Sequence, residues 1–80
     1  MDLHQFNQKP LEQRAGILTR QGTFLAVRHR SQYVICLYHM NQFFAELWYE
    51  PRRHEFVLAR GHPRWRVYDG EPGRREGKRN

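Results

Sequence analysis

Four apolar and aromatic segments follow one another between residues 23 and 60, and they constrain the fold more than any other feature of this chain. In order they read TFLAVRHR, YVICLYHM, FFAELWYE and EFVLAR. β-Branched and aromatic residues are abundant in them, as is usual in strands. The polar breaks between them are two to four residues long, which is the usual length of hairpin loops. The pattern therefore predicts a continuous antiparallel meander of four strands.

Hairpin geometry assigns the strand residues to two faces. Residues directly opposite one another in neighbouring strands share a face, and so does every second residue along a strand. We take Ser31-Gln32 and Asn41-Gln42 as turns and residues 51–54 as the third connection. All three hairpins then place the same set inward. This predicted core face comprises Leu25, Val27, Val34, Cys36, Tyr38, Met40, Phe43, Ala45, Leu47, Tyr49, Phe56 and Leu58.

A short helix is predicted ahead of the meander, in the segment PLEQRAGILTRQG. Pro10 suits a first helical turn, and Gly22 is expected to end the helix in the left-handed conformation. The apolar residues at helical spacing are Leu11, Ala15, Ile17 and Leu18. Leu3 and Phe6 are expected to pack beside this helix. We therefore predict a two-layer α+β domain, with a short N-terminal helix packed on an antiparallel β-meander of four or five strands.

The length of 80 residues allows one domain with one small core. We assign residues 1–69 to it. A fifth strand near residues 65–68 either extends the sheet or begins to close a small barrel. Residues 70–80, GEPGRREGKRN, contain no apolar side chain and cannot offset the entropy of ordering, so they are predicted to be a disordered basic tail.

Cysteine use and hydropathy indicate the cellular compartment of the chain. Cys36 is the only cysteine, which excludes an intrachain disulfide and favours a reduced, intracellular setting. The first ten residues, MDLHQFNQKP, lack the features of a secretory signal. No apolar stretch approaches the roughly 20 residues that span a bilayer. We expect a soluble cytoplasmic protein with no membrane contact.

The sheet face opposite the predicted core carries more apolar and aromatic residues than a purely solvated face needs. Its predicted rows place Phe24 opposite His39, and Glu46 opposite Ala59. We expect this face to bind a protein partner or a second copy of the chain. The residues assigned to the interface are Phe24, Arg28, Tyr33, Ile35, Phe44 and Trp48. The alternative is a solvated face on which long charged side chains cover apolar neighbours.

A basic stretch offers a second hypothesis, nucleic-acid binding. Guanidinium groups neutralise phosphates while aromatic rings stack on bases, and this stretch alternates the two residue types. The residues are Arg52, Arg53, Arg60, Arg64, Trp65 and Arg66. The formal net charge of +6 favours such a partner. No RNA-recognition, helix-turn-helix or zinc-finger pattern accompanies them, and arginines in loops commonly serve solubility alone.

Catalytic chemistry has little support in this chain, so we predict a non-enzymatic protein without cofactor or metal. The five histidines fall at no recognisable ligand spacing. Cys36 lies in the middle of an inward strand face, where a buried small residue is more common than an activated thiol. Glu46 and Glu50 are interpreted as partners of arginines. An enzyme would need a pocket that holds His39 or Glu46 with a perturbed pKa.

The segments FLAVRH, YVICLYHM and FFAELWYE give the central meander a style that resembles small uncharacterised single-domain bacterial proteins. The resemblance covers mainly the meander and contains no signature motif. It implies neither an activity nor any site residue.

Overall fold

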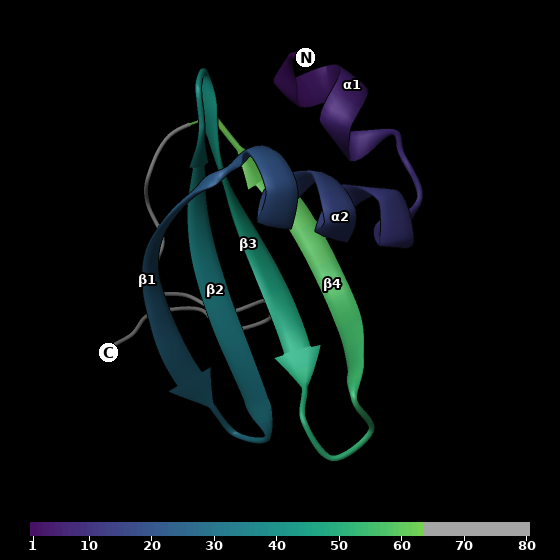
Figure 1. Ribbon diagram of the computed structural model, residues 1–80, viewed down its shortest axis with the longest axis vertical. Coiled ribbons are helices and arrows are strands. Elements are labelled where there is room, and N and C mark those ends of the chain that lie inside the picture. The colour runs from purple at the N-terminus through teal and green to yellow at the C-terminus, as the bar shows by residue number, and fades with distance from the viewer. Residues whose placement is uncertain (64–80) are drawn as a thin grey trace, which may run out of the picture.

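Two helices and four strands make up the fold in the computed structural model, which describes residues 1–63 of the chain. The elements are α1 (Leu3–Asn7), α2 (Leu11–Gln21), β1 (Thr23–Arg30), β2 (Tyr33–Met40), β3 (Phe43–Glu50) and β4 (Glu55–His62). Both helices lie on one face of the sheet (Figure 1). The predicted α+β class and antiparallel meander are confirmed. The predicted fifth strand, the basic tail and the domain limit at residue 69 fall outside the described residues.

The strands are antiparallel and lie in the order β1-β2-β3-β4. The turns fall at residues 31–32, 41–42 and 51–54, as predicted. One residue in each has a positive φ: Ser31 (57°), Asn41 (52°) and His54 (54°). Because side chains crowd the backbone in this region, these positions carry a small local cost that the hairpins offset.

The predicted register is confirmed in the middle of the sheet. Between β2 and β3, Met40 pairs with Phe43 and Cys36 pairs with Leu47. Between β1 and β2, the pairing predicted at the turn continues as far as Ala26. A two-residue turn determines how the residues of its two strands pair, from the turn outward, until an irregularity occurs in one of the strands.

An irregularity in β1, between Phe24 and Ala26, changes the prediction for the start of that strand. Phe24 pairs with Tyr38, so the expected pairing of Phe24 with His39 is wrong. One extra residue in a strand moves every residue beyond it by one position along its partner. Phe24 therefore changes faces relative to the prediction.

A second irregularity, between Trp48 and Tyr49, changes the pairing of β3 with β4. Leu47 pairs with Ala59 instead of Leu58, and Glu46 pairs with Arg60 instead of Ala59. Phe56 remains opposite Tyr49, as predicted. Ala59 therefore joins the core in place of Leu58.

The core lies between α2, α1 and the sheet. Its buried members are Phe6, Ala15, Ile17, Leu18, Met40, Phe43, Ala45, Leu47 and Ala59, with Leu3, Leu11, Cys36 and Tyr38 packed against them. The predicted helix stripe and the predicted packing of Leu3 and Phe6 are confirmed. Three other members of the predicted core face are exposed: Leu25 (42%), Val27 (48%) and Phe56 (41%).

The limited reach of α2 explains these exposed residues. An eight-residue strand is about 26 Å long, whereas a helix is only about 10 Å in diameter. α2 crosses the strands near the end of the sheet where β1 and β3 begin (Figure 1). It packs mainly on β4, and also on β2 and β3. The other end of this face and the β1 edge therefore remain uncovered by the helices.

The ends of the helices use local hydrogen bonds. Asp2 and Gln5 form a capping box at α1, in which each side chain accepts from the other residue's backbone N–H. Gly22 ends α2 with an extended backbone (φ −83°) because the chain continues directly into β1. The predicted left-handed stop is therefore wrong. A Cβ at Gly22 would lie 2.8 Å from the Leu18 carbonyl oxygen. This close approach to the last turn of α2 explains why the position is a glycine.

The outer edge of β4 is held by side chains from the helical segment. The Gly61 backbone N–H donates to Asn7 Oδ1 (3.0 Å), and Arg14 Nη1 donates to the Ala59 carbonyl oxygen. Neither α1 nor α2 has the length and apolar character that a membrane crossing requires.

Candidate functional site

The predicted interaction face is largely packed within the described structure. Ile35 is 4% exposed and Trp48 is 6% exposed, whereas Arg28, Tyr33 and Phe44 are half-buried. Arg28 pairs with Ile35, and Ile35 pairs with Trp48. The Tyr33 and Trp48 rings meet edge to face, with centroids 5.5 Å apart. These five residues share the face opposite the helices.

Phe24 lies apart from the other five predicted interface residues. Its ring contacts Tyr38 edge to face, with centroids 5.9 Å apart, and Tyr38 packs against the core. Phe24 therefore belongs to the helix-covered face, where it is 54% exposed. The irregularity in β1 separates it from the predicted set.

Glu46 is a buried carboxylate at the centre of a polar cluster, on the sheet face opposite the helices. Trp48 Nε1 donates to Glu46 Oε1 (3.2 Å), and His62 Nε2 lies 3.8 Å from the same oxygen. Burial raises the pKa of Glu46, but the polar contacts of His62 and Trp48 and the charge of Arg60 outweigh it, so the pKa lies below its ordinary value. This carboxylate is an anchored anion rather than a free base.

Glu50 has a structural role at the end of β3. Its side chain is 3% exposed, and its Oε1 accepts from the Arg53 backbone N–H (2.9 Å). The carboxylate therefore orders the β3–β4 turn.

The predicted nucleic-acid residues do not gather into one patch within the described residues. Arg52 and Arg53 are exposed in the β3–β4 turn, where Arg53 Nε lies 3.6 Å from Glu55 Oε2. Arg60 is half-buried near the other end of β4 and pairs with Glu46. The remaining three residues, Arg64, Trp65 and Arg66, fall outside the described part of the chain.

An exposed apolar surface lies on the helix-covered side, beyond the reach of α2. We call it the open apolar surface, and its residues are Phe24, Val27 and Phe56, with exposures of 54%, 48% and 41%. Leu25, the extra residue at the irregularity in β1, is 42% exposed beside them. Half-buried Val34 and Tyr49 connect β1 to β4 across it. The Tyr49 and Phe56 ring centroids are 5.3 Å apart. Sequence reasoning missed this surface, although the shortness of the single helix beside four strands was a usable signal.

Cys36 and Tyr38 lie two residues apart in β2, and neither side chain is an activated nucleophile. Burial raises the pKa of the Cys36 thiol. Burial, followed by the charge of Cys36, raises the pKa of Tyr38. Both groups are therefore protonated at neutral pH, which makes the thiol a poor nucleophile.

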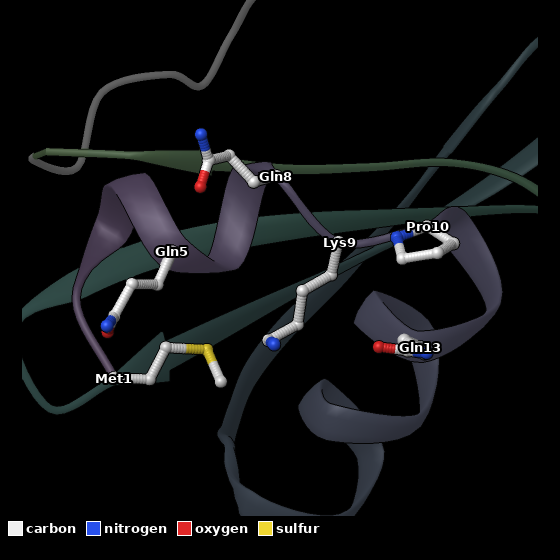
Figure 2. A pocket seen from close by; sticks show the side chains of 6 residues that line it. All are labelled: Met1, Gln5, Gln8, Lys9, Pro10 and Gln13. Atoms are coloured by element: carbon white, nitrogen blue, oxygen red, sulfur yellow. The ribbon is translucent and has the colours of Figure 1, made fainter.

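A hollow of about 490 Å³ lies beside α1, the connection to α2 and the start of α2. Figure 2 shows its lining residues: Met1, Gln5, Gln8, Lys9, Pro10 and Gln13. These supply amides and one ammonium group but no carboxylate or imidazole. Within residues 1–63, no three side chains among histidine, cysteine, aspartate and glutamate come together to hold a metal ion.

Comparison with known proteins found no matching protein-family model, no matching curated protein and no matching solved structure.

Proposed function

We propose that this protein is a small, non-enzymatic interaction module that binds a protein partner or a second copy of itself through the open apolar surface. One observation carries the proposal. Four large apolar side chains on one small sheet are each more than 40% exposed, and contiguous apolar area of this kind commonly marks a binding surface. The proposal keeps the interaction role expected from the sequence and transfers it to the other face.

The packing of the originally predicted face supports this transfer. Trp48 and Ile35 are already buried, so a partner would gain little by covering them. The anchored Glu46 and the protonated Cys36 thiol support a role without catalysis. A cytoplasmic setting fits a chain whose only cysteine is unpaired.

Charge substitution on the open apolar surface tests the proposal. We expect the double variant Val27→Lys/Phe56→Lys to bind at least about tenfold more weakly than wild type, because burying two ammonium groups is costly. Binding is measured as the recovery of a partner from native lysate, or as self-association in sedimentation velocity. The matched control is Gln21→Lys/Gln42→Lys, which adds the same charge at exposed positions and should behave as wild type. Equal binding by the two double variants would contradict the proposal, as would a wild-type chain that binds nothing and remains monomeric.

Nucleic-acid binding is the alternative function, and the exposure of Arg52 and Arg53 in the β3–β4 turn favours it. A fluorescence titration with a short single strand tests it. Binding should weaken as salt rises, because phosphate contacts release counterions. Arg52→Gln/Arg53→Gln should weaken it further, whereas salt-independent or absent binding would reject this function.

A further inference from the structure

The sheet face opposite the helices is buried, although no helix or loop of residues 1–63 lies over it. Both helices lie on the other face (Figure 1), and short turns at the ends of the sheet join the strands. Ile35, Glu46 and Trp48 on the face opposite the helices are nevertheless 4%, 6% and 6% exposed. Neighbours within one sheet layer leave the upper side of a side chain open to water, so a second layer is expected here.

The other face of the same two strands provides an internal comparison. Val34 pairs with Tyr49, and beside them Ile35 pairs with Trp48, so two cross-strand pairs occupy opposite faces at one level of β2 and β3. Each pair has an aromatic ring beside it in its own face. Beyond the reach of α2, the Val34–Tyr49 pair is only half-buried. The deeper burial of the Ile35–Trp48 pair therefore points to a covering layer that residues 1–63 do not supply.

Two nitrogen atoms on this face need hydrogen-bond partners. Arg60 pairs with Glu46, and His62 follows two residues later in β4, so both side chains lie on the face opposite the helices. Arg60 Nε and His62 Nε2 are buried, and neither has a hydrogen-bond partner among the described residues. Buried polar groups in proteins nearly always have one. Backbone groups of a segment lying over the face could bind them.

The chain that follows β4 has the composition and the reach to cover this face. Pro63 lies in a bend directly after β4, and residues 64–68 read RWRVY, in which Trp65 and Val67 alternate with arginines. The end of β4 is four residues from the position that pairs with Trp48, a distance of about 13 Å. Five extended residues span about 17 Å, so this segment can reach the buried pair.

The outer edge of β4 is not open to this segment. The Gly61 N–H donates to Asn7, and the Ala59 carbonyl accepts from Arg14. Side chains that occupy an edge in this way protect it against strand addition. A fifth strand folding back beside this end of β4 would have to displace both bonds, whereas a segment crossing the face displaces neither.

We propose that residues 64–68 of this chain cover the sheet face opposite the helices. Trp65 and Val67 pack over Trp48 and close the second side of the sheet. The inference is independent of the proposed function, which uses the open apolar surface on the other face. It also withdraws Trp65 from stacking on a base, in contrast to the nucleic-acid hypothesis.

Acrylamide quenching of Trp48 tests whether this segment covers it. Trp48 and Trp65 are the only tryptophans, so Trp48 is the sole reporter in both Trp65→Ser/Val67→Ser and the matched control Trp65→Phe/Val67→Ile. The control keeps the segment apolar. We expect the quenching constant to be at least about threefold higher for the serine variant, with far-UV circular dichroism unchanged, because the apolar cover is lost. Equal quenching in the two variants would overturn the proposal.

The reverse experiment locates Trp65, which is the only tryptophan in Trp48→Phe. Adding Leu37→Lys, at a half-buried position on the face opposite the helices, should raise its quenching constant by at least about threefold, because an ammonium group would be buried beneath the segment. Val27→Lys, which adds the same charge to the open apolar surface, is the matched control and should leave Trp65 shielded.

The outcomes of the reverse experiment separate this proposal from the proposed function. Trp65 that is quenched as freely in native buffer as in urea overturns the covering segment and leaves the proposed function standing. Equal effects of Leu37→Lys and Val27→Lys also overturn the covering segment. Release of Trp65 by Val27→Lys alone would place the segment on the open apolar surface, which overturns this proposal and removes the free surface on which the proposed function rests.

Discussion

Glu46 shows how a single residue acquires surroundings that its neighbours in sequence do not indicate. Its backbone pairs with Arg60, fourteen residues away, and its carboxylate contacts Trp48 and His62. Sequence reasoning placed it opposite Ala59, so Arg60 and His62 were missed as its neighbours.

We predict that Glu46 contributes to the pH dependence of stability. Its pKa in the folded chain lies below the ordinary value of 4.5, so its stabilising effect is present above about pH 4.5 and is lost as the pH falls through the lower folded value. Between about pH 5 and about pH 3, the free energy of unfolding should fall more steeply for wild type than for Glu46→Gln. Urea denaturation at each pH measures this difference. Glu12→Gln, an exposed helix position, is the control, and a Glu46→Gln profile parallel to wild type would refute the prediction.

At the scale of elements, the contact between α1 and β4 depends on a glycine. A Cβ at Gly61 would lie 2.5 Å from Leu3 Cδ1 and 3.3 Å from the rings of Phe6 and Phe43. A side chain at this position of β4 would therefore force Leu3, and the rings of Phe6 and Phe43, to shift. The backbone N–H of Gly61 also donates to Asn7. Side-chain packing and a hydrogen bond therefore both hold α1 against β4.

Gly61→Ala should lower the free energy of unfolding by about 1–3 kcal/mol, because the added methyl group overpacks the core. Gly16→Ala is an informative comparison. A Cβ there meets only the flexible end of Arg20, and alanine favours a helix interior by roughly 0.8–1 kcal/mol. The midpoints of thermal and urea denaturation should therefore fall for Gly61→Ala and rise for Gly16→Ala. A neutral or stabilising Gly61→Ala would show that α1 does not pack as described.

At the scale of the whole molecule, the burial of the two sheet faces differs from that predicted. Part of the face expected to bind a partner is buried, and part of the face expected to be core is open. α2 covers only one end of its face (Figure 1), and the extended β1 edge lies beyond it. A domain of this size cannot bury both faces completely.

Paired alanine variants test this distribution of buried and exposed side chains. Trp48→Ala should destabilise the fold by about 3–5 kcal/mol, as expected for a buried aromatic residue. Phe56→Ala, at a side chain 41% exposed, should cost only about 1 kcal/mol. Urea denaturation measures both, and similar losses for the two variants would contradict the assignment of buried and open surfaces.

The elements of this fold were accessible from the sequence because their signals are local. The two-residue breaks at 31–32 and 41–42 determine the pairing of β2 with its neighbours, and the apolar stripe from Leu11 to Leu18 indicates the helix. The irregularities at Phe24 and Trp48 could not be predicted in this way. No glycine or proline occupies these positions, so no local signal marks them.

The sequence by itself determined the strands, the turns, the helix and the alternation of faces, because each depends on residues within a few positions of one another. Only the tertiary structure decided which apolar residues are covered. That depends on where an eleven-residue helix crosses a sheet about twice as long as the helix is wide. It also depends on two register shifts that exchange Ala59 for Leu58 in the core and carry Phe24 to the other face. The open apolar surface is a consequence of this incomplete coverage.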